Sequence, residues 1–164
     1  MTSTRESMEA LLNKMRNKKH LRFNVDYYSE KNPNPFEWKV LFEGPIDSIY
    51  EGGFFMVRIK FTSDYPNSRP SAYFMNKIFH PHIYIGNESN FQGDVCLNIQ
   101  NKDIHSVLVA IVSMFHDYDK DVDHAYPEEP RRLINESKDK FIEKAKKWVH
   151  DYAKYEDIDK FYDL

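Results

Sequence analysis

Three stretches of the chain alternate strictly between apolar and polar side chains, and this period of two is the pattern that most limits the fold. The residues that share one face are Leu21, Phe23, Val25 and Tyr27, then Trp38, Val40 and Phe42, then Phe55, Val57, Ile59 and Phe61. Such alternation is typical of strands with one buried face. Because only short turn-rich segments separate the stretches, we expect an antiparallel meander, with Ala72–Met75 as a weaker fourth strand.

Helical periods flank these strands on both sides. Ser3 and Glu6 have the spacing of a capping box, and the apolar residues behind them predict a helix that ends near Lys18. Downstream, Val107–Phe115 is apolar enough to be a helix buried against the sheet, and residues 134–152 keep helical spacing. The tail, Asp157–Leu164, adds a further helical turn. The pattern predicts an α+β fold with a sheet covered on one face.

The length of 164 residues, 41% of them hydrophobic, fits a single domain spanning residues 1–164. A net charge of −3 lacks the basic footprint that binds phosphate backbones, so we expect no nucleic-acid partner. The first twenty residues have no apolar core of signal-peptide length, and no later run reaches membrane-spanning length. We therefore expect no membrane partner and a cytoplasmic or nuclear location, which suits a chain with one cysteine.

That cysteine, Cys96, lies in a stretch without sustained period, from Phe79 to Asn101. A lone cysteine is usually a small buried hydrophobe. Here Gly93 and Asp94 precede it, and His80 and His82 lie in the same stretch, which favours a turn that solvent can reach. The residues leave two readings open, a buried side chain or a nucleophile.

His80, His82 and Cys96 also carry the imidazole and thiolate groups that zinc prefers. Two histidines two positions apart can share one face of an extended chain. No spaced set completes a tetrahedral site, however, since His105 and His116 belong to the next segment. We expect no metal.

Several motifs in order along the chain resemble the ubiquitin-conjugating enzyme family. They are Tyr50-Glu51-Gly52-Gly53, Asp64-Tyr65-Pro66, Arg69-Pro70, His80-Pro81-His82 and Gly93-Asp94-Val95-Cys96-Leu97-Asn98-Ile99. The opening helix and a C-terminal helix with Lys147-Trp148 also have counterparts. The resemblance covers nearly the whole chain and implies a ubiquitin-conjugating-enzyme-like fold: an N-terminal helix, a four-stranded meander, an active-site loop and two to three C-terminal helices.

The resemblance implies an acyltransferase that accepts ubiquitin or a ubiquitin-like modifier on Cys96 as a thioester and passes it to a lysine or an N-terminal amine. The implied partners are the modifier, an activating enzyme, a ubiquitin ligase and a substrate protein. No cofactor is implied, because the upstream activating enzyme uses the ATP, and the expected state is a monomer. A thiol suits this chemistry, since a thiolate attacks well and a thioester reacts readily with amines.

The family's motif assigns roles to the residues around Cys96. His80 and Pro81 correspond to structural loop positions. His82 replaces the asparagine that stabilises the oxyanion, and an imidazole N–H can donate that bond although its charge changes around neutral pH. Tyr84 can lower the pKa of the attacking lysine by desolvation, or simply pack on the loop. Asp121 or Asp123 is the candidate acidic gate, and a solvated acidic loop is the alternative.

The chain departs from the family around the cysteine. Fourteen residues lead from His82 to Cys96, where the family usually has about eight, and the extra ones lie within Gly86–Gln92. The usual Trp-Ser-Pro segment after the cysteine is missing, and Asn67 stands where an aromatic residue helps to bind RING-type ligases. These departures keep a second hypothesis open: a catalytically silent variant that binds ubiquitin or a ligase.

Overall fold

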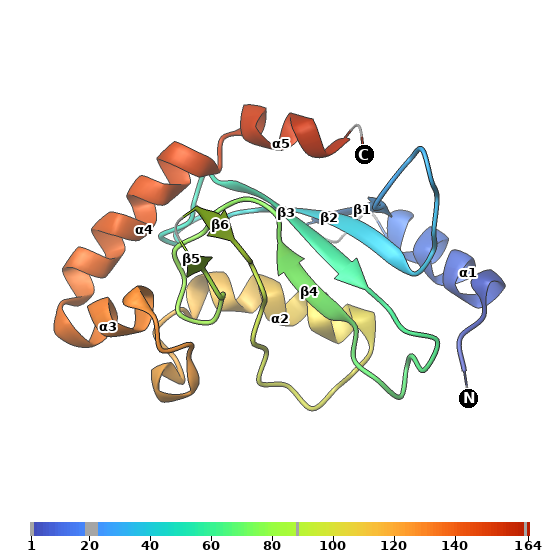
Figure 1. Cartoon of the computed structure of the whole chain (residues 1–164), viewed down its shortest axis with the longest axis horizontal. Coiled ribbons are helices and arrows are strands. Elements are labelled where there is room, and N and C mark those ends of the chain that lie inside the picture. Colours follow the sequence, from blue (N-terminus) through green and yellow to red (C-terminus); the bar gives the residue numbers. More distant parts are fainter. Residues whose placement is uncertain (1, 19–22, 88, 163) are drawn as a thin grey trace.

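A computed structural model describes residues 2–18, 23–87, 89–162 and 164 (Figure 1). The chain begins with helix α1 (Arg5–Arg16) and continues into strands β1 (Phe23–Tyr27), β2 (Glu37–Glu43), β3 (Phe54–Lys60) and β4 (Ser71–Phe74). A short hairpin follows, made of β5 (Gly86–Asn87) and β6 (Asn90–Phe91). Helices α2 (Ile104–His116), α3 (Glu129–Glu136), α4 (Lys138–Tyr152) and α5 (Tyr155–Tyr162) complete the chain, with a 3-10 turn at Val122–His124.

The four long strands form one antiparallel sheet in the order β1-β2-β3-β4, so the predicted meander is confirmed. Its register aligns Val25 with Val40, Val40 with Val57, and Val57 with Phe74. One-face alternation therefore continues from strand to strand, and an apolar row crosses the inner face of the sheet. Leu21, expected to open the first strand, lies outside the described residues.

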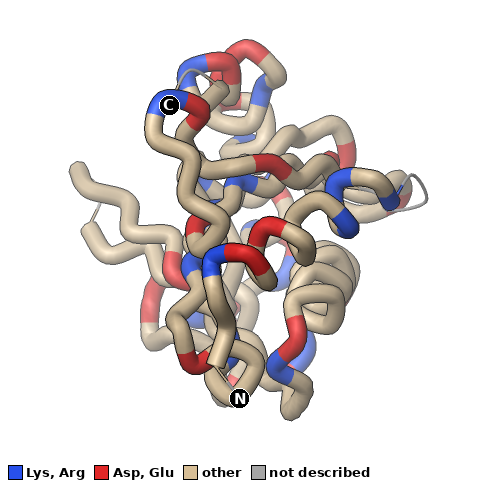
Figure 2. Tube along the Cα trace, turned by 90° about the vertical axis from the view of Figure 1, so that its right-hand side faces the viewer, with Lys and Arg blue, Asp and Glu red and all other residues tan. Residues whose placement is uncertain are grey.

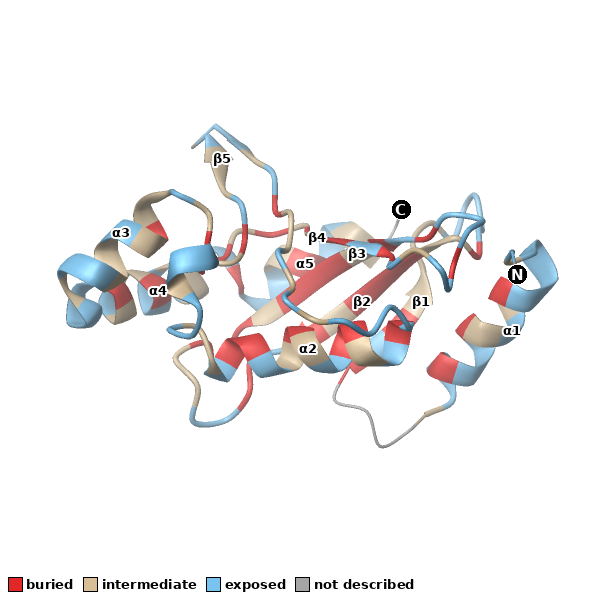
Figure 3. Ribbon diagram, turned by 90° about the horizontal axis from the view of Figure 1, so that it is seen from below, coloured by how far each residue is buried: buried red, intermediate tan, exposed pale blue. Residues whose placement is uncertain are grey.

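Helix α2 covers the inner face of the sheet, as the apolar segment predicts (Figure 3). Its Phe115 is fully buried, and the ring packs against those of Phe42, Phe55 and Phe74 at centroid distances of 5.4–6.4 Å. Aromatic rings at such distances add to the free energy gained from burying their area. This packing fixes α2 relative to β4 and to the segment that follows it.

The N-terminal helix has the expected apolar face, but its cap is one residue later than the sequence suggests. Thr4, not Ser3, is the N-cap, and its side chain and that of Ser7 exchange hydrogen bonds with each other's backbone N–H. Ser3 instead donates its hydroxyl to Tyr65 O and its backbone N–H to Ser63 O. The prediction of a Ser3–Glu6 capping box was therefore wrong, because Ser3 uses its hydroxyl and its backbone N–H to bond to the loop after β3.

Helix α5 lies on the outer face of the sheet, opposite α2, so helices contact both faces and not only the one that the sequence predicted (Figure 1). Ile158 is fully buried, and Tyr155 packs edge-on against Phe54 of β3. Lys39 is only 3% exposed, and its ammonium donates to Phe161 O and Tyr162 O, each at 3.1 Å. A buried ammonium is stable only with such acceptors, so the last carbonyls of α5 hold the charge of Lys39.

The expected long helix over residues 134–152 is two helices, α3 and α4. Ser137 ends one and caps the other: its backbone is extended, at φ −162° and ψ 103°, and its hydroxyl accepts a hydrogen bond from Lys140 N. A hydroxyl that caps a helix competes with continuing one. The described residues after β6 thus form four α-helices, α2–α5.

The charge distribution and the helix lengths bear on the expectation that neither a nucleic acid nor a membrane is a partner. Basic and acidic residues are interspersed along the trace in the side view, so that face carries charge of mixed sign (Figure 2). Among the described residues, no helix combines the length and the apolar character that crossing a membrane requires.

Candidate active site

Cys96 is exposed and lies directly across from His82 in a ladder of backbone hydrogen bonds. Cys96 N donates to His82 O at 2.9 Å, Tyr84 N to Asp94 O at 2.8 Å, and Gly93 N to Tyr84 O at 2.8 Å. Strands β5 and β6 continue this pairing to the tip. Apart from residue 88, which lies outside the described residues, the extra residues Gly86–Gln92 therefore form the end of a paired hairpin rather than an irregular loop.

The same hairpin is joined to the main sheet beyond β4. Phe74 N donates to Gly93 O at 2.8 Å, and Val95 N donates to Ala72 O at 3.1 Å. The backbone leading to Cys96 is thus paired on both sides, to the residues after His82 and to β4. Since each pairing restricts the backbone, the position of the thiol is fixed by the sheet.

Gly93 makes the second pairing possible. Its φ is +80°, and a Cβ at this position would lie 2.0 Å from Phe74 O. Residues other than glycine rarely adopt this φ, and a Cβ atom cannot occupy the space that the carbonyl oxygen of Phe74 fills. Glycine is therefore required two ways, by backbone conformation and by the close approach of β4.

His80 is fully buried beneath the loop that holds Cys96. Its Nε2 donates to Met114 O at 2.7 Å near the end of α2, and its Nδ1 accepts from His82 N at 3.0 Å. Both ring nitrogens of a neutral imidazole are satisfied in this way. Burial lowers the pKa of His80 from 6.5 to about 3; the nearby His82 lowers it too, while the bond to Met114 O opposes the shift. Pro81 connects the two histidines and accepts a hydrogen bond at its carbonyl from Tyr126 N.

The half-buried side chain of His82 lines the groove beside Cys96 and reaches the acidic loop. Its Nε2 lies 2.8 Å from Lys120 O, and since a carbonyl can only accept, Nε2 carries the proton and donates. The neutral ring then has its lone pair on Nδ1. His82 therefore connects two segments, through its carbonyl to Cys96 and through its side chain to the loop before the 3-10 turn.

The two candidate acidic residues are placed differently. Asp121 lines the groove that contains Cys96, with its backbone in the left-handed region at φ 52°. Asp123 is exposed and does not line that groove. Their neighbours are paired: Asp119 with Lys138 at 2.7 Å and Asp117 with Lys120 at 3.4 Å. The acidic stretch is thus partly held by ion pairs, and of the two candidate gates Asp121 is the one that lines the groove.

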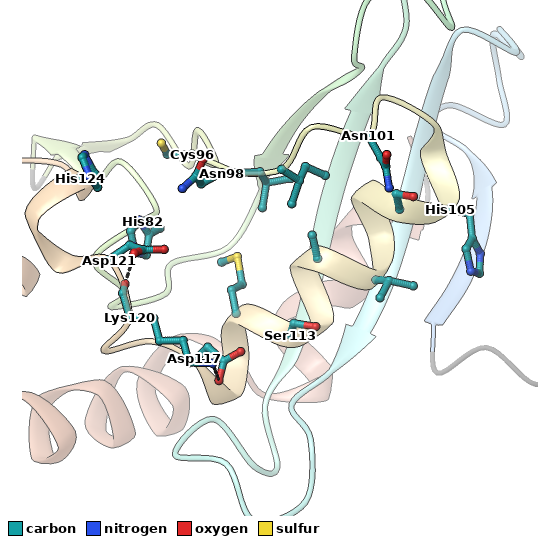
Figure 4. Close-up of a pocket in the computed structure, with 16 residues that line it drawn as sticks. His82, Cys96, Asn98, Asn101, His105, Ser113, Asp117, Lys120, Asp121 and His124 are labelled. Atoms are coloured by element: carbon teal, nitrogen blue, oxygen red, sulfur yellow. Dashed lines mark hydrogen bonds and ion pairs between the residues drawn. The ribbon is translucent and has the colours of Figure 1, made fainter.

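The groove runs from Cys96 along α2 and has a volume of about 520 Å³. In Figure 4, His82, Asp121 and His124 lie around the Cys96 end, while Asn101 and His105 mark the far end. Leu97 and Ile99 line one wall, and Val109, 45% exposed, lies on the helix opposite them. An exposed thiol therefore stands at the end of an open, largely apolar channel.

Tyr84 and Tyr126 form an aromatic pair on the other side of the hairpin, with ring centroids 5.2 Å apart. Tyr84 is 38% exposed. Burial raises the pKa of Tyr126 to about 12, and negative charge at Cys96, Asp94 and Glu128 adds to the rise. Glu128 accepts hydrogen bonds from Ile85 N at 2.9 Å and Gly86 N at 3.0 Å, which fastens the hairpin to the segment before α3.

Sequence reasoning missed Asp94, His124 and Tyr126 as neighbours of the thiol. Asp94 lies two positions before Cys96 in the signature, and that spacing could have marked it. Nothing in the local sequence distinguishes His124 or Tyr126, which reach the site only because the chain returns after α2. Within the described part of the chain, no group of three or more histidine, cysteine, aspartate or glutamate residues could hold a metal ion.

Comparison with known proteins identifies the same family over most of the chain. A family model described as "Ubiquitin-conjugating enzyme" matches residues 5–149. The chain is also similar to "Ubiquitin-conjugating enzyme E2 2" of Candida glabrata, with 33% identity over 124 residues that cover 71% of this chain and 68% of that protein. The family-model match over residues 5–149 includes the sheet, the residues of the groove and the segment that carries Cys96.

The clash at Gly93 predicts an unusually large loss of stability on substitution. Gly52 is a matched control, because its φ is +84° but a Cβ there would meet nothing within 4 Å. We expect Gly93→Ala to lower the free energy of unfolding by at least ~2 kcal/mol more than Gly52→Ala does. Urea denaturation of both variants measures the difference, and equal losses would show that β4 does not press against Gly93.

The buried His80 predicts that the fold weakens in acid. The unfolded chain protonates this residue near pH 6.5, but the native state does so only near 3, so unfolded chains bind more protons between these values. Stability should fall as the pH drops through this window, with a His80 contribution approaching about 1.4 kcal/mol per pH unit. Urea denaturation at several pH values would test this, and a His80→Gln variant with the same slope as the parent would contradict it.

Proposed function

The chain belongs to the ubiquitin-conjugating enzyme family, and we propose that its residues 1–164 form one catalytic domain that carries ubiquitin or a ubiquitin-like modifier as a thioester on Cys96. An activating enzyme that consumes ATP supplies the modifier, and the acceptor is a lysine or an N-terminal amine, usually presented with a ligase. The observation that carries the proposal is the exposed thiol at the end of the groove along α2.

Loading is a thioester exchange. The Cys96 thiolate attacks the carbonyl carbon of the modifier on the activating enzyme; a new C–S bond forms, the old one breaks, and the departing thiolate takes up a proton. Thiols undergo this exchange without a metal or cofactor. The groove supports the assignment, since Leu97, Ile99 and Val109 offer apolar contacts to an extended C-terminal segment that ends at the sulfur.

Discharge is the attack of a neutral amine on the loaded thioester. Nitrogen bonds to the carbonyl carbon, the oxygen becomes an oxyanion, and the C–S bond then breaks. The amine proton ends on the Cys96 sulfur, so the products are an amide and the free thiol. Exposed Tyr84, paired with Tyr126, provides an apolar surface that lowers the pKa of a lysine ammonium by removing water from it.

His82 has two proposed roles in this step. Through its carbonyl it accepts from Cys96 N and fixes the backbone that carries the thiol. Its Nε2–H is engaged by Lys120 O, so donation to the oxyanion requires either that this bond be exchanged or that Nδ1 be protonated. Asp121, which lines the groove beside Cys96, is the better placed of the two candidate acidic gates.

The loops that bind ligases in the family are joined here by three side chains. Arg69 donates to Ile99 O, Lys102 donates to Asn67 O, and the hydroxyl of Tyr65 accepts from Ile104 N. These bonds connect the loop after β3 to the segment that replaces Trp-Ser-Pro. We propose that this joined surface receives the ligase, with polar contacts where the family uses aromatic ones.

The proposal predicts a covalent thioester adduct with the modifier that depends on the Cys96 sulfur. Incubation with activating enzyme, ATP and ubiquitin should give a gel-shifted product that reductant removes, because thioesters are cleaved by excess thiol. Cys96→Ala should give no product, and Cys96→Ser should give an oxygen ester that resists reductant. If ubiquitin and its common relatives all fail to charge the unmodified protein, the alternative of a silent binding module is favoured.

Replacement of His82 tests the oxyanion assignment separately from loading. We expect His82→Asn to retain or increase the rate of discharge to free lysine, because an amide supplies two N–H donors in a similar position. His82→Ala should reduce it by about 10² to 10³, the usual effect of losing an oxyanion donor. Discharge of purified thioester in a single turnover measures both variants, and its abolition by His82→Asn would contradict the role.

A further inference from the structure

A second cavity lies beside Cys96 and differs in character from the groove along α2. It has a volume of about 330 Å³ and is lined by residues 69–73, Asp94, Val95, Leu97 and Tyr126. We call it the flanking cleft. Leu97 lines both cavities, and Cys96 lines the groove only. The segment Asp94–Leu97 therefore separates two sites, one on each side of the chain that carries the thiol.

Asp94 brings an unpaired negative charge into the flanking cleft. Its backbone is fixed, since its carbonyl accepts from Tyr84 N at 2.8 Å and the residue bridges to Tyr73 at the end of β4. Its carboxylate makes no hydrogen bond or ion pair with any described residue, although it is half-buried. A partly buried carboxylate without a partner favours a cation beside it.

The other charged groups near the flanking cleft do not neutralise the Asp94 carboxylate, so its preference for a cation remains. Arg69 is the cation among the lining residues, and its guanidinium donates to Ile99 O, outside the cleft. Glu128 lies near Tyr126, and its carboxylate stays on the backbone of the hairpin. Burial and the negative groups together raise the pKa of Tyr126 to about 12, so the phenol stays neutral. Its ring face can then contact the cation.

We propose that the flanking cleft binds a lysine or arginine side chain next to the acceptor lysine of the substrate protein, and that Asp94 is the residue that determines this specificity. The inference rests on the thioester role proposed for Cys96. The groove and the flanking cleft share Leu97, and neighbouring residues of an extended peptide are separated by about 3.5 Å, so a residue close to an acceptor lysine is within reach of the cleft. The preferred substrate is a basic peptide segment.

The test compares two acceptor peptides that each contain one lysine, flanked by arginine in one and by glutamine in the other. Loaded protein is mixed with each peptide, and kcat/KM for discharge is measured. We expect the parent to favour the arginine peptide by about 3- to 10-fold, as one charge pair near a surface allows. Asp94→Asn should bring the ratio near one, mainly through KM and with the larger loss on the arginine peptide, while Asp94→Glu should restore the preference.

Two controls separate specificity from structural damage. Asp139→Asn removes a carboxylate of α4 that lines neither the groove nor the flanking cleft and should leave the ratio unchanged. Raising the salt concentration to about 1 M should reduce the parent's preference, because the screening length falls to about 3 Å.

The outcomes distinguish the two proposals. A ratio that Asp94→Asn does not change, or an equal loss with both peptides, overturns the assignment of Asp94 while leaving the carrier function intact. Failure of the parent to charge would overturn the thioester role and the cleft with it.

Discussion

The position of the exposed Cys96 thiol depends on backbone pairing more than on any side chain around it. The segment before Cys96 donates and accepts hydrogen bonds on both edges, to the residues after His82 and to β4. This double pairing extends the sheet by one irregular ribbon, and Gly93 is the point at which β4 approaches it most closely. The extra residues of the chain lie at the free end of that ribbon, where added length does not move the thiol.

His80 and His82 add side-chain hydrogen bonds to the backbone frame, that is, to the paired segments around Cys96. One is buried and bonded to the end of α2, and the other reaches the loop before the 3-10 turn. Segments separated by more than thirty residues in sequence are held around Cys96 through them. An unpaired polar group beneath the site would be costly, so the neutral state of His80 is part of the frame rather than an incidental shift.

The sheet, the inner helix and the cysteine signature were predictable because each leaves a local pattern. Alternation at Val40 and Val57 identifies strands before any partner is known, and the apolar run ending at Phe115 can only be buried. The β5–β6 hairpin was not predictable, since Gly86–Gln92 is short and polar and gains its order from pairing and from Glu128, forty-two residues away at Gly86. Tyr126 and Lys120 O come near Cys96 only because the chain returns to the site after α2. No local sequence pattern predicts that return.

The buried ammonium of Lys39 makes the C-terminal helix an integral layer of the molecule. Its partners are the carbonyls of Phe161 and Tyr162, and α5 covers β3 from the side opposite the groove. A chain shortened before Tyr155 would turn this interior into surface, with Met56 and the Lys39 ammonium open to water. Trimming the chain near Phe161 therefore alters the outer face of the sheet.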